Sequence, residues 1–185
     1  MRRVFVPLAP GFEEIEAVTI IDVLRRAGVE VVVAGTSVGL IEGSNGIKIS
    51  ADKTLDQVRV SDFDMIALPG GTLGVENLKK DARLLPLLRE FSEKGKYLSA
   101  ICAAPSLLSS AGLLRGKQAT SYPSFLREVS ASCLYSEDRV VTDGKIVTSR
   151  GPGTAMEFAL KLVEILVGTE KVSELKKAML TPASP

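Results

Sequence analysis

Short apolar runs alternate along the chain with longer segments in which apolar residues recur at helical spacing. The short runs, at 4–8, 29–34, 65–68, 97–101 and 145–149, are typical of buried strands. The longer segments, at 13–27, 81–94, from 102 to about 110, and 154–167, are typical of helices. Repeated strand-then-helix units are joined by right-handed crossovers. The pattern therefore predicts one doubly wound α/β domain over residues 1–185, with a mostly parallel sheet and helices on both faces.

Turn-forming residues separate these elements. Asn45-Gly46 and Asp143-Gly144 each lie between β-rich runs and predict hairpin turns. The helix at 81–94 is predicted despite Pro86, and a glycine follows it, as expected at a helix end. Residues 180–185 are expected to form a frayed tail.

Composition limits both the core and the partners. Hydrophobic residues make up 45% of the 185-residue chain and aromatic residues only 5%, with no Trp, so the core must consist largely of Val, Ile, Leu and Ala. The 23 basic and 22 acidic residues give a net charge of +1, which offers no global field for nucleic acid or an anionic membrane. No apolar run approaches the ~18 residues of a membrane span.

The chain contains no histidine, which excludes Ser-His-Asp triads, Cys-His dyads and zinc sites with histidine ligands. Its two cysteines are too few for a disulfide framework. The first residues are not expected to act as a signal peptide or a transit sequence. We therefore expect a soluble protein of the reducing cytoplasm.

Cys102 is the strongest candidate for a reactive group. It follows the strand at 97–101, and ligands of open α/β sheets bind outside the carboxyl ends of the strands. Ala103, Ala104 and Pro105 suit a tight turn into a helix, whose N-terminus would favour the thiolate. The alternative is an inert cysteine that packs as a small hydrophobic residue. Cys133 has no comparable context and is interpreted as structural.

Glu16 is the second candidate. On a helical projection it falls on the apolar stripe with Ile20 and Val23, whereas Glu14 falls on the opposite, polar side with Asp22. Glu16 would then be a desolvated carboxyl group with a raised pKa, able to act as a general acid or base. The alternative is a charge near the helix N-terminus that reaches solvent past the helix end.

The glycine-rich segments do not form a nucleotide site. Neither 69–74 nor 151–156 matches a phosphate-binding or dinucleotide fingerprint. Instead, the backbone N–H groups of Gly71 and Ala103 could stabilise an oxyanion that forms beside Cys102. No metal site and no organic cofactor are expected.

Five stretches together carry a resemblance to a known family, and their spacing covers nearly the whole chain. They are APGFEEIEAV, VLRRAGVEV, LPGGTLGVENL, AICAAP and YSEDRVVTDGKIVTSRGPGTAMEFAL. The chain resembles the ThiJ/PfpI superfamily and, within it, the DJ-one branch. This resemblance implies a flavodoxin-like sandwich, similar to class I glutamine amidotransferases. It also implies a homodimer, to whose surface Arg26 and the first helix would contribute.

The resemblance also implies roles for the site residues. The family's reactive cysteine falls on Cys102, its partner glutamate on Glu16, and its backbone donors on Gly71 and Ala103. Members of the branch are described as glutathione-independent glyoxalases and as deglycases, acting on methylglyoxal-type aldehydes or on glycated adducts. They are also described as redox sensors, whose cysteine oxidises to a sulfinate, and as chaperones. A dimeric scaffold or holdase that does not need the cysteine is a further alternative.

The chain departs from the family pattern at two positions. The human member has a histidine in a Thr-His-Pro segment near the cysteine, where this chain has Tyr122, a poor base near neutral pH. Protease-like relatives place histidine directly after the nucleophile, where this chain has Ala103. Peptidase and amidotransferase activities are therefore not expected. Tyr122 is expected to line the pocket, and so are Gly70, Arg150 and Pro152.

Overall fold

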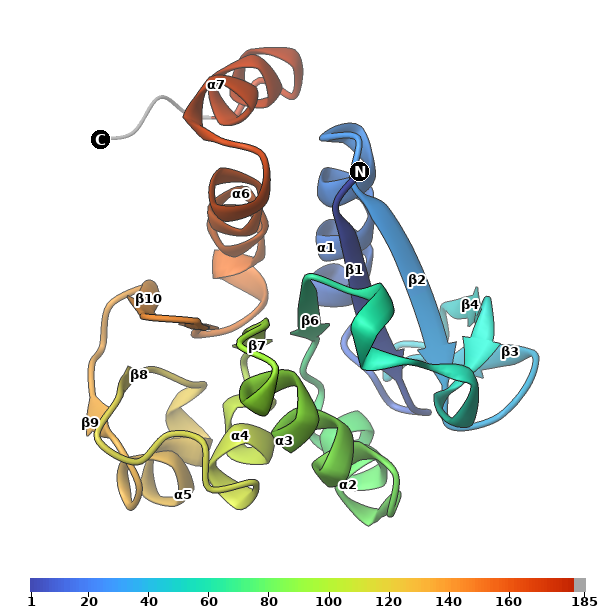
Figure 1. The fold of residues 1–185 in the computed structure, drawn as a ribbon, viewed down its shortest axis with the longest axis vertical. Coiled ribbons are helices and arrows are strands. Elements are labelled where there is room, and N and C mark those ends of the chain that lie inside the picture. Colours follow the sequence, from blue (N-terminus) through green and yellow to red (C-terminus); the bar gives the residue numbers. More distant parts are fainter. Residues whose placement is uncertain (182–185) are drawn as a thin grey trace.

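The computed structural model describes residues 1–181, and most of the expected tail, 182–185, lies outside the described residues. A seven-stranded sheet forms its centre, in the order β10-β11-β7-β6-β1-β2-β5 (Figure 1). The strands are β1 (Arg3–Leu8), β2 (Glu30–Gly35), β5 (Lys53–Thr54), β6 (Met65–Leu68), β7 (Tyr97–Ile101), β10 (Val140–Asp143) and β11 (Ile146–Ser149). All neighbouring pairs are parallel except β10 and β11. The predicted fold class, mostly parallel α/β, is confirmed.

The strand order places the helices on both faces of the sheet. The chain moves from β1 to β2 in one direction and from β6 to β7 in the other, so right-handed crossovers place the connecting helices on opposite faces. On one face α1 (Glu14–Arg26) packs against α6 (Ala155–Leu166). On the other, α3 (Leu84–Glu93) contacts β6, β7 and α4 (Pro105–Ser110). The remaining helices are α2 (Thr72–Lys80), α5 (Leu126–Ser130) and α7 (Thr169–Ala178).

Both predicted hairpins are present. Asn45-Gly46 joins β3 (Leu40–Glu42) to β4 (Lys48–Ser50), and Asp143-Gly144 joins β10 to β11. A further small sheet pairs β8 (Gln118–Ala119) with β9 (Leu134–Tyr135). The first hairpin matters for the site, because it folds back over the start of α1.

Four helices differ from the sequence-based expectation. The predicted helix at 81–94 begins only at Leu84, because Asp81 ends α2 and its carboxylate accepts the N–H of Arg83. Pro86 is then the third residue of α3, where no intrahelical N–H bond is lost. The hydrophobic pattern does not predict α2, α5 or α7.

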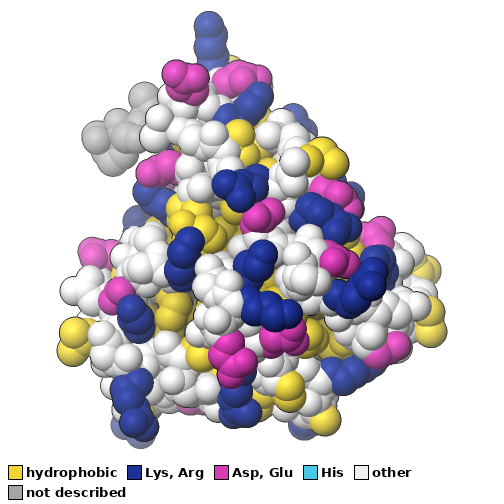
Figure 2. Space-filling view, viewed as in Figure 1, with side chains coloured by type: hydrophobic (Ala, Val, Ile, Leu, Met, Phe, Trp, Pro, Cys, Tyr) yellow, Lys and Arg dark blue, Asp and Glu magenta, His cyan; other side chains and the backbone are white. Residues whose placement is uncertain are grey.

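The core is aliphatic, as the composition requires, with buried Val, Ile, Leu and Ala side chains around a few phenylalanines. On the face shown in Figure 2, basic and acidic side chains are interspersed, in agreement with the small net charge. Among the residues described, no helix has both the length and the apolar character needed to cross a membrane.

Candidate active site

Cys102 occupies a strained position directly after β7. Its φ is 65°, in the left-handed region that residues other than glycine rarely adopt, at a cost of about 1–3 kcal/mol. Two backbone hydrogen bonds hold this geometry: the N–H of Cys102 donates to the carbonyl of Ser149 (3.0 Å), and its own carbonyl accepts the N–H of Tyr122 (2.8 Å). The turn therefore fixes the thiol at the carboxyl edge of the sheet, where the sequence placed it.

Glu16 lies in the first turn of α1 and is 0% exposed. The alternative of a charge that escapes past the helix end is therefore wrong. Its Oε2 accepts the N–H of Gly70 at 2.7 Å, while its buried Oε1 finds no N–H or O–H partner in the described part of the chain. The carboxyl group of Glu16 also interacts with the thiol of Cys102.

Gly70 is the contact point between these two side chains. A Cβ atom at this position would lie 2.6 Å from Cys102 Cβ and 2.7 Å from Glu16 Oε2. Any side chain there would push the carboxyl and the thiol apart. Glycine is therefore a steric requirement of the pair, although Gly70 is itself buried and does not line the cavity.

The carboxyl and the thiol perturb each other. Burial raises the pKa of Glu16 from its ordinary 4.5 to about 7, although the N–H of Gly70 opposes this rise. Burial, followed by the charge of Glu16, raises the pKa of Cys102 to about 12. Because the two groups are coupled, their protons belong to the pair. Over a wide pH range above 7 the pair holds a single proton.

This coupling corrects the expectation that the helix N-terminus alone favours the thiolate. The N–H groups of Gly71 and Ala103 do lower the pKa of Cys102, but burial and the Glu16 carboxylate outweigh them. Once the proton moves from sulfur to Glu16, the charge repulsion is removed and the two N–H groups remain as donors to the thiolate. The protonation of Glu16 thus decides when the thiolate exists.

The two expected backbone donors come from different elements. Ala103 begins the turn into α4, and Gly71 precedes α2 with a φ of 92°, a conformation that glycine adopts without strain. A Cβ on Gly71 would also lie 2.5 Å from the carbonyl oxygen of Gly11. The structure therefore brings together Cys102, Glu16 and both predicted donors.

A cavity of about 470 Å³ opens in front of the thiol. Among the expected pocket residues, Tyr122 and Pro152 line it. Arg150 does not, because its guanidinium donates to the carbonyl of Glu137 (3.0 Å), so the expectation that it lines the pocket is not supported. Residues that sequence analysis did not assign to the pocket complete the lining: Glu13, Ser44, Thr72, Leu73 and Phe125.

Glu14 is a second buried carboxylate that the helical projection misplaced. It is only 3% exposed, because the β3–β4 hairpin covers it. Its oxygens accept the N–H of Asn45 (2.5 Å), the side-chain amide of Asn45 (3.0 Å) and the hydroxyl of Ser44 (3.1 Å). A helical projection of α1 shows only the residues of that helix, so it cannot reveal that residues 43–47 cover Glu14.

Cys133 is partly buried and lies in a different hollow, with Arg115 and residues 130–134. It does not line the cavity of Cys102. Within residues 1–181 no group of three or more Cys, Asp or Glu side chains is arranged to hold a metal ion.

Comparison with known proteins identifies the family of the chain. The family model described as DJ-1/PfpI family matches residues 2–165. The chain belongs to the DJ-1/PfpI family. The crystal structure of Drosophila melanogaster DJ-1beta superposes with a TM-score of 0.94 at 44% identity, over 98% of this chain and 99% of that one.

Two curated relatives extend the comparison within the DJ-1/PfpI family. Protein DJ-1 homolog A of Arabidopsis thaliana is 45% identical over 100% of this chain, which spans only 48% of that relative's length. The glutathione-independent glyoxalase DJR-1.2 of Caenorhabditis elegans is 36% identical, over 90% of this chain and 89% of the relative.

Proposed function

We propose that the chain protects against reactive carbonyl compounds as a glutathione-independent glyoxalase acting on methylglyoxal-type aldehydes. The observation that carries the proposal is the buried Glu16 carboxyl beside the Cys102 thiol, with the N–H groups of Gly71 and Ala103 directed at the sulfur. The name of the Caenorhabditis elegans relative supports this choice of activity.

The first step is attack of the Cys102 sulfur on the aldehyde carbon. As the S–C bond forms, the thiol proton passes to Glu16, whose Oε1 has no other N–H or O–H partner in residues 1–181. The aldehyde oxygen becomes an oxyanion, and the N–H groups of Gly71 and Ala103 stabilise it. Protonation of that oxygen gives a hemithioacetal.

The second step is a proton shift between neighbouring carbons. A base removes the hydrogen from the former aldehyde carbon, and the neighbouring carbonyl carbon gains a proton, which leaves a thioester of lactate on Cys102. Water then cleaves the thioester and regenerates the thiol, so methylglyoxal plus water yields lactate with no net oxidation. We assign the proton transfers to Glu16, which acts beside the sulfur. Glu13, which lines the cavity, is the competing carboxylate.

The activity has a defined pH dependence under this mechanism. Attack requires Glu16 to accept the thiol proton, so kcat/KM should rise with pH through about 7, the pKa of Glu16. A rate that is flat between pH 6 and pH 8 would contradict this role.

The decisive experiment is glutathione-free conversion of methylglyoxal to lactate by wild type, Cys102→Ser, Glu16→Gln and Glu13→Gln. We expect lactate from wild type and losses of at least about a hundredfold in Cys102→Ser and Glu16→Gln. Cys133→Ser is the matched control, because Cys133 lies in another hollow. A collapse in Glu13→Gln, with Glu16→Gln unaffected, would transfer the role to Glu13. Lactate formation by Cys102→Ser at the wild-type rate would refute the mechanism.

The same site supports a second function, redox sensing without catalysis. Two-step oxidation of Cys102 by peroxide would give a sulfinate, whose oxygens could accept the N–H groups of Gly71 and Ala103 and the proton of Glu16. Mass mapping after mild peroxide treatment should then find the sulfinate at Cys102 and not at Cys133. Consumption of methylglyoxal in stoichiometric amounts, without lactate, would favour this function, with a chaperone role as one possible output.

We further propose that the protein is a cytoplasmic homodimer. Ile15 and Val18 on α1 are 57% and 45% exposed, and Ile47 on the adjoining hairpin is 55% exposed. A second copy would bury these apolar side chains. Val18→Arg should produce a monomer by light scattering, and an unchanged mass would contradict this surface.

A further inference from the structure

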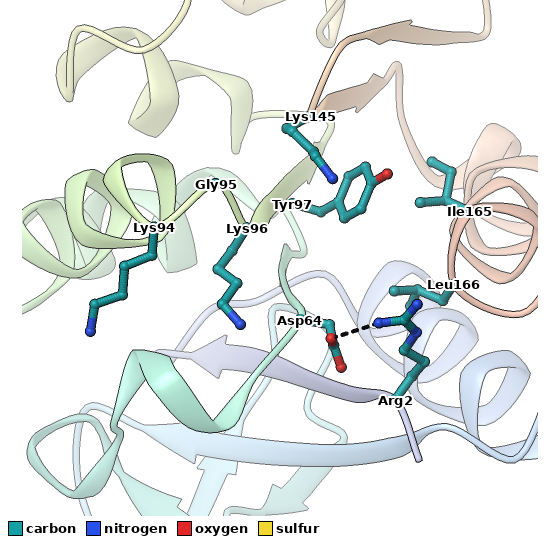
Figure 3. A pocket seen from close by; sticks show the side chains of 9 residues that line it. All are labelled: Arg2, Asp64, Lys94, Gly95, Lys96, Tyr97, Lys145, Ile165 and Leu166. Atoms are coloured by element: carbon teal, nitrogen blue, oxygen red, sulfur yellow. Dashed lines mark hydrogen bonds and ion pairs between the residues drawn. The ribbon is translucent and has the colours of Figure 1, made fainter.

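A second cavity lies at the edge of the sheet opposite Cys102. Four neighbouring parallel strands, in the order β11-β7-β6-β1, begin there. The residue immediately before each of them is charged: Lys145, Lys96, Asp64 and Arg2. Their side chains gather around a cavity of about 320 Å³ that Lys94, Tyr97, Ile165 and Leu166 also line (Figure 3).

The charge of this cavity is unbalanced. Four of the lining side chains are cationic, and Asp64 is the single acidic one. Asp64 is already engaged, because one carboxylate oxygen accepts the guanidinium of Arg2 (3.0 Å) and the other the N–H of Arg3 (2.9 Å). It can therefore neutralise Arg2, but a single carboxylate does not balance the four cationic side chains that line the cavity.

Two of the three lysines have no carboxylate partner. Lys94 pairs with Glu90 on its own helix at 2.6 Å. Lys145 instead lies over the ring of Tyr97, 3.9 Å from its centroid. Lys96 forms no ion pair in the described part of the chain, but its charge helps to lower the pKa of Asp64, and Figure 3 shows the two residues on the same side of the cavity. Strand starts are usually charged for solubility, but two unpaired ammonium groups at the wall of one hollow suit an anion.

The opposite wall of the cavity is apolar. Ile165 and Leu166, at the end of α6, face the cavity beside the ring of Tyr97 (Figure 3). A purely inorganic anion would leave this wall in contact with water. A ligand that joins an anionic group to an apolar ring would use both walls.

We propose that this cavity binds a small organic phosphate, with its phosphate between Lys96 and Lys145 and its apolar part against Tyr97, Ile165 and Leu166. Lysine ammonium groups act as point charges and suit a compact dianion of this kind. The site is separate from Cys102 and does not depend on the proposed function, since the two cavities open at opposite ends of the strands.

Calorimetric titration of the full chain with phenyl phosphate at low salt tests the site. We expect saturable binding at one site per chain, at least about tenfold tighter than that of inorganic phosphate. Lys96→Glu should weaken it at least tenfold, and Lys96→Gln should weaken it less. Lys80→Glu is the matched control, because Lys80 lies at the exposed end of α2 and makes no ion pair in residues 1–181, so its affinity should stay within twofold of wild type. Cys102→Ser should bind as wild type does.

Three results would overturn the proposal. They are the absence of saturable binding, equal affinities for phenyl phosphate and inorganic phosphate, and unchanged binding in a Lys96→Glu protein. Thermal unfolding of each variant separates a lost site from a lost fold. Loss of binding in both Lys96→Glu and Lys80→Glu would indicate a general charge effect and would also overturn the site.

Discussion

Glu16 and Cys102 meet at Gly70, which contacts both side chains and donates its N–H to the carboxylate. One glycine thus sets the separation of the two groups and opposes part of the pKa rise that burial causes in Glu16. The mechanism proposed above depends on this spacing, because it requires the proton to pass between sulfur and oxygen.

Gly70→Ala should disrupt the pair. The added Cβ would lie 2.6 Å from Cys102 Cβ and 2.7 Å from Glu16 Oε2, so one of the two must move. We expect a loss of about 1–3 kcal/mol in the free energy of unfolding, measured in urea, and a fall in kcat. Gly153→Ala is the control, because nothing lies within 4 Å of its Cβ position. Equal stabilities of the two variants would refute the steric role.

The free energy of unfolding should depend on pH through Glu16. Below its ordinary pKa of 4.5 the group is protonated in both the folded and the unfolded states, whereas above about 7 the folded state must bury a carboxylate that water solvates in the unfolded state. The stability is therefore lost as pH rises from 4.5 through 7, by about 3 kcal/mol. Urea unfolding of wild type and Glu16→Gln at pH 5 and pH 8 measures this loss. Between the two pH values, the free energy of unfolding should fall by more in wild type than in Glu16→Gln. An equal change in the free energy of unfolding of both proteins would contradict the raised pKa of Glu16.

Glu14 should hold the β3–β4 hairpin against α1. Hydrogen bonds from Asn45 and Ile47 overcome the effect of burial and lower the pKa of this carboxyl group. Glu14→Gln replaces a charged acceptor with a neutral one, so we expect a cost of about 1–3 kcal/mol. Amide hydrogen exchange at Asn45 and Ile47 should become faster. Glu76→Gln is the control, because Glu76 is exposed on α2, away from the hairpin, and forms no ion pair in residues 1–181. Unchanged exchange in Glu14→Gln would show that the backbone alone holds the hairpin.

Tyr122 should act through its ring and not through its hydroxyl. The side chain lines the cavity, but the hydroxyl forms no hydrogen bond with the described residues. Tyr122→Phe should therefore keep kcat within about twofold, whereas Tyr122→Ala should raise KM as the cavity widens. Steady-state kinetics on methylglyoxal distinguishes the two. A large fall of kcat in Tyr122→Phe would mean that the hydroxyl replaces the histidine of the human relative.

Local patterns in the sequence predict the parallel sheet and point to Cys102 and Glu16 as candidate site residues. Apolar runs of strand length, separated by helical segments, lead to parallel pairing, since crossovers favour one hand. Cys102 was found because it follows a buried strand, and Glu16 because a carboxylate on an apolar stripe breaks the helical pattern. Both signals are local and periodic, so they are visible before the chain folds.

Which side chains lie next to one another depends on tertiary packing. Ser44, Glu13 and Phe125 come from separate segments to line one cavity, and Glu14 is buried by a hairpin that its own helix cannot reveal. The pKa values of Glu16 and Cys102 depend on burial and on each other, and both are properties of the packed molecule. The charged residues that line the second cavity precede different strands and are far apart in the sequence. They lie together only because parallel pairing aligns the starts of these strands at one edge of the sheet.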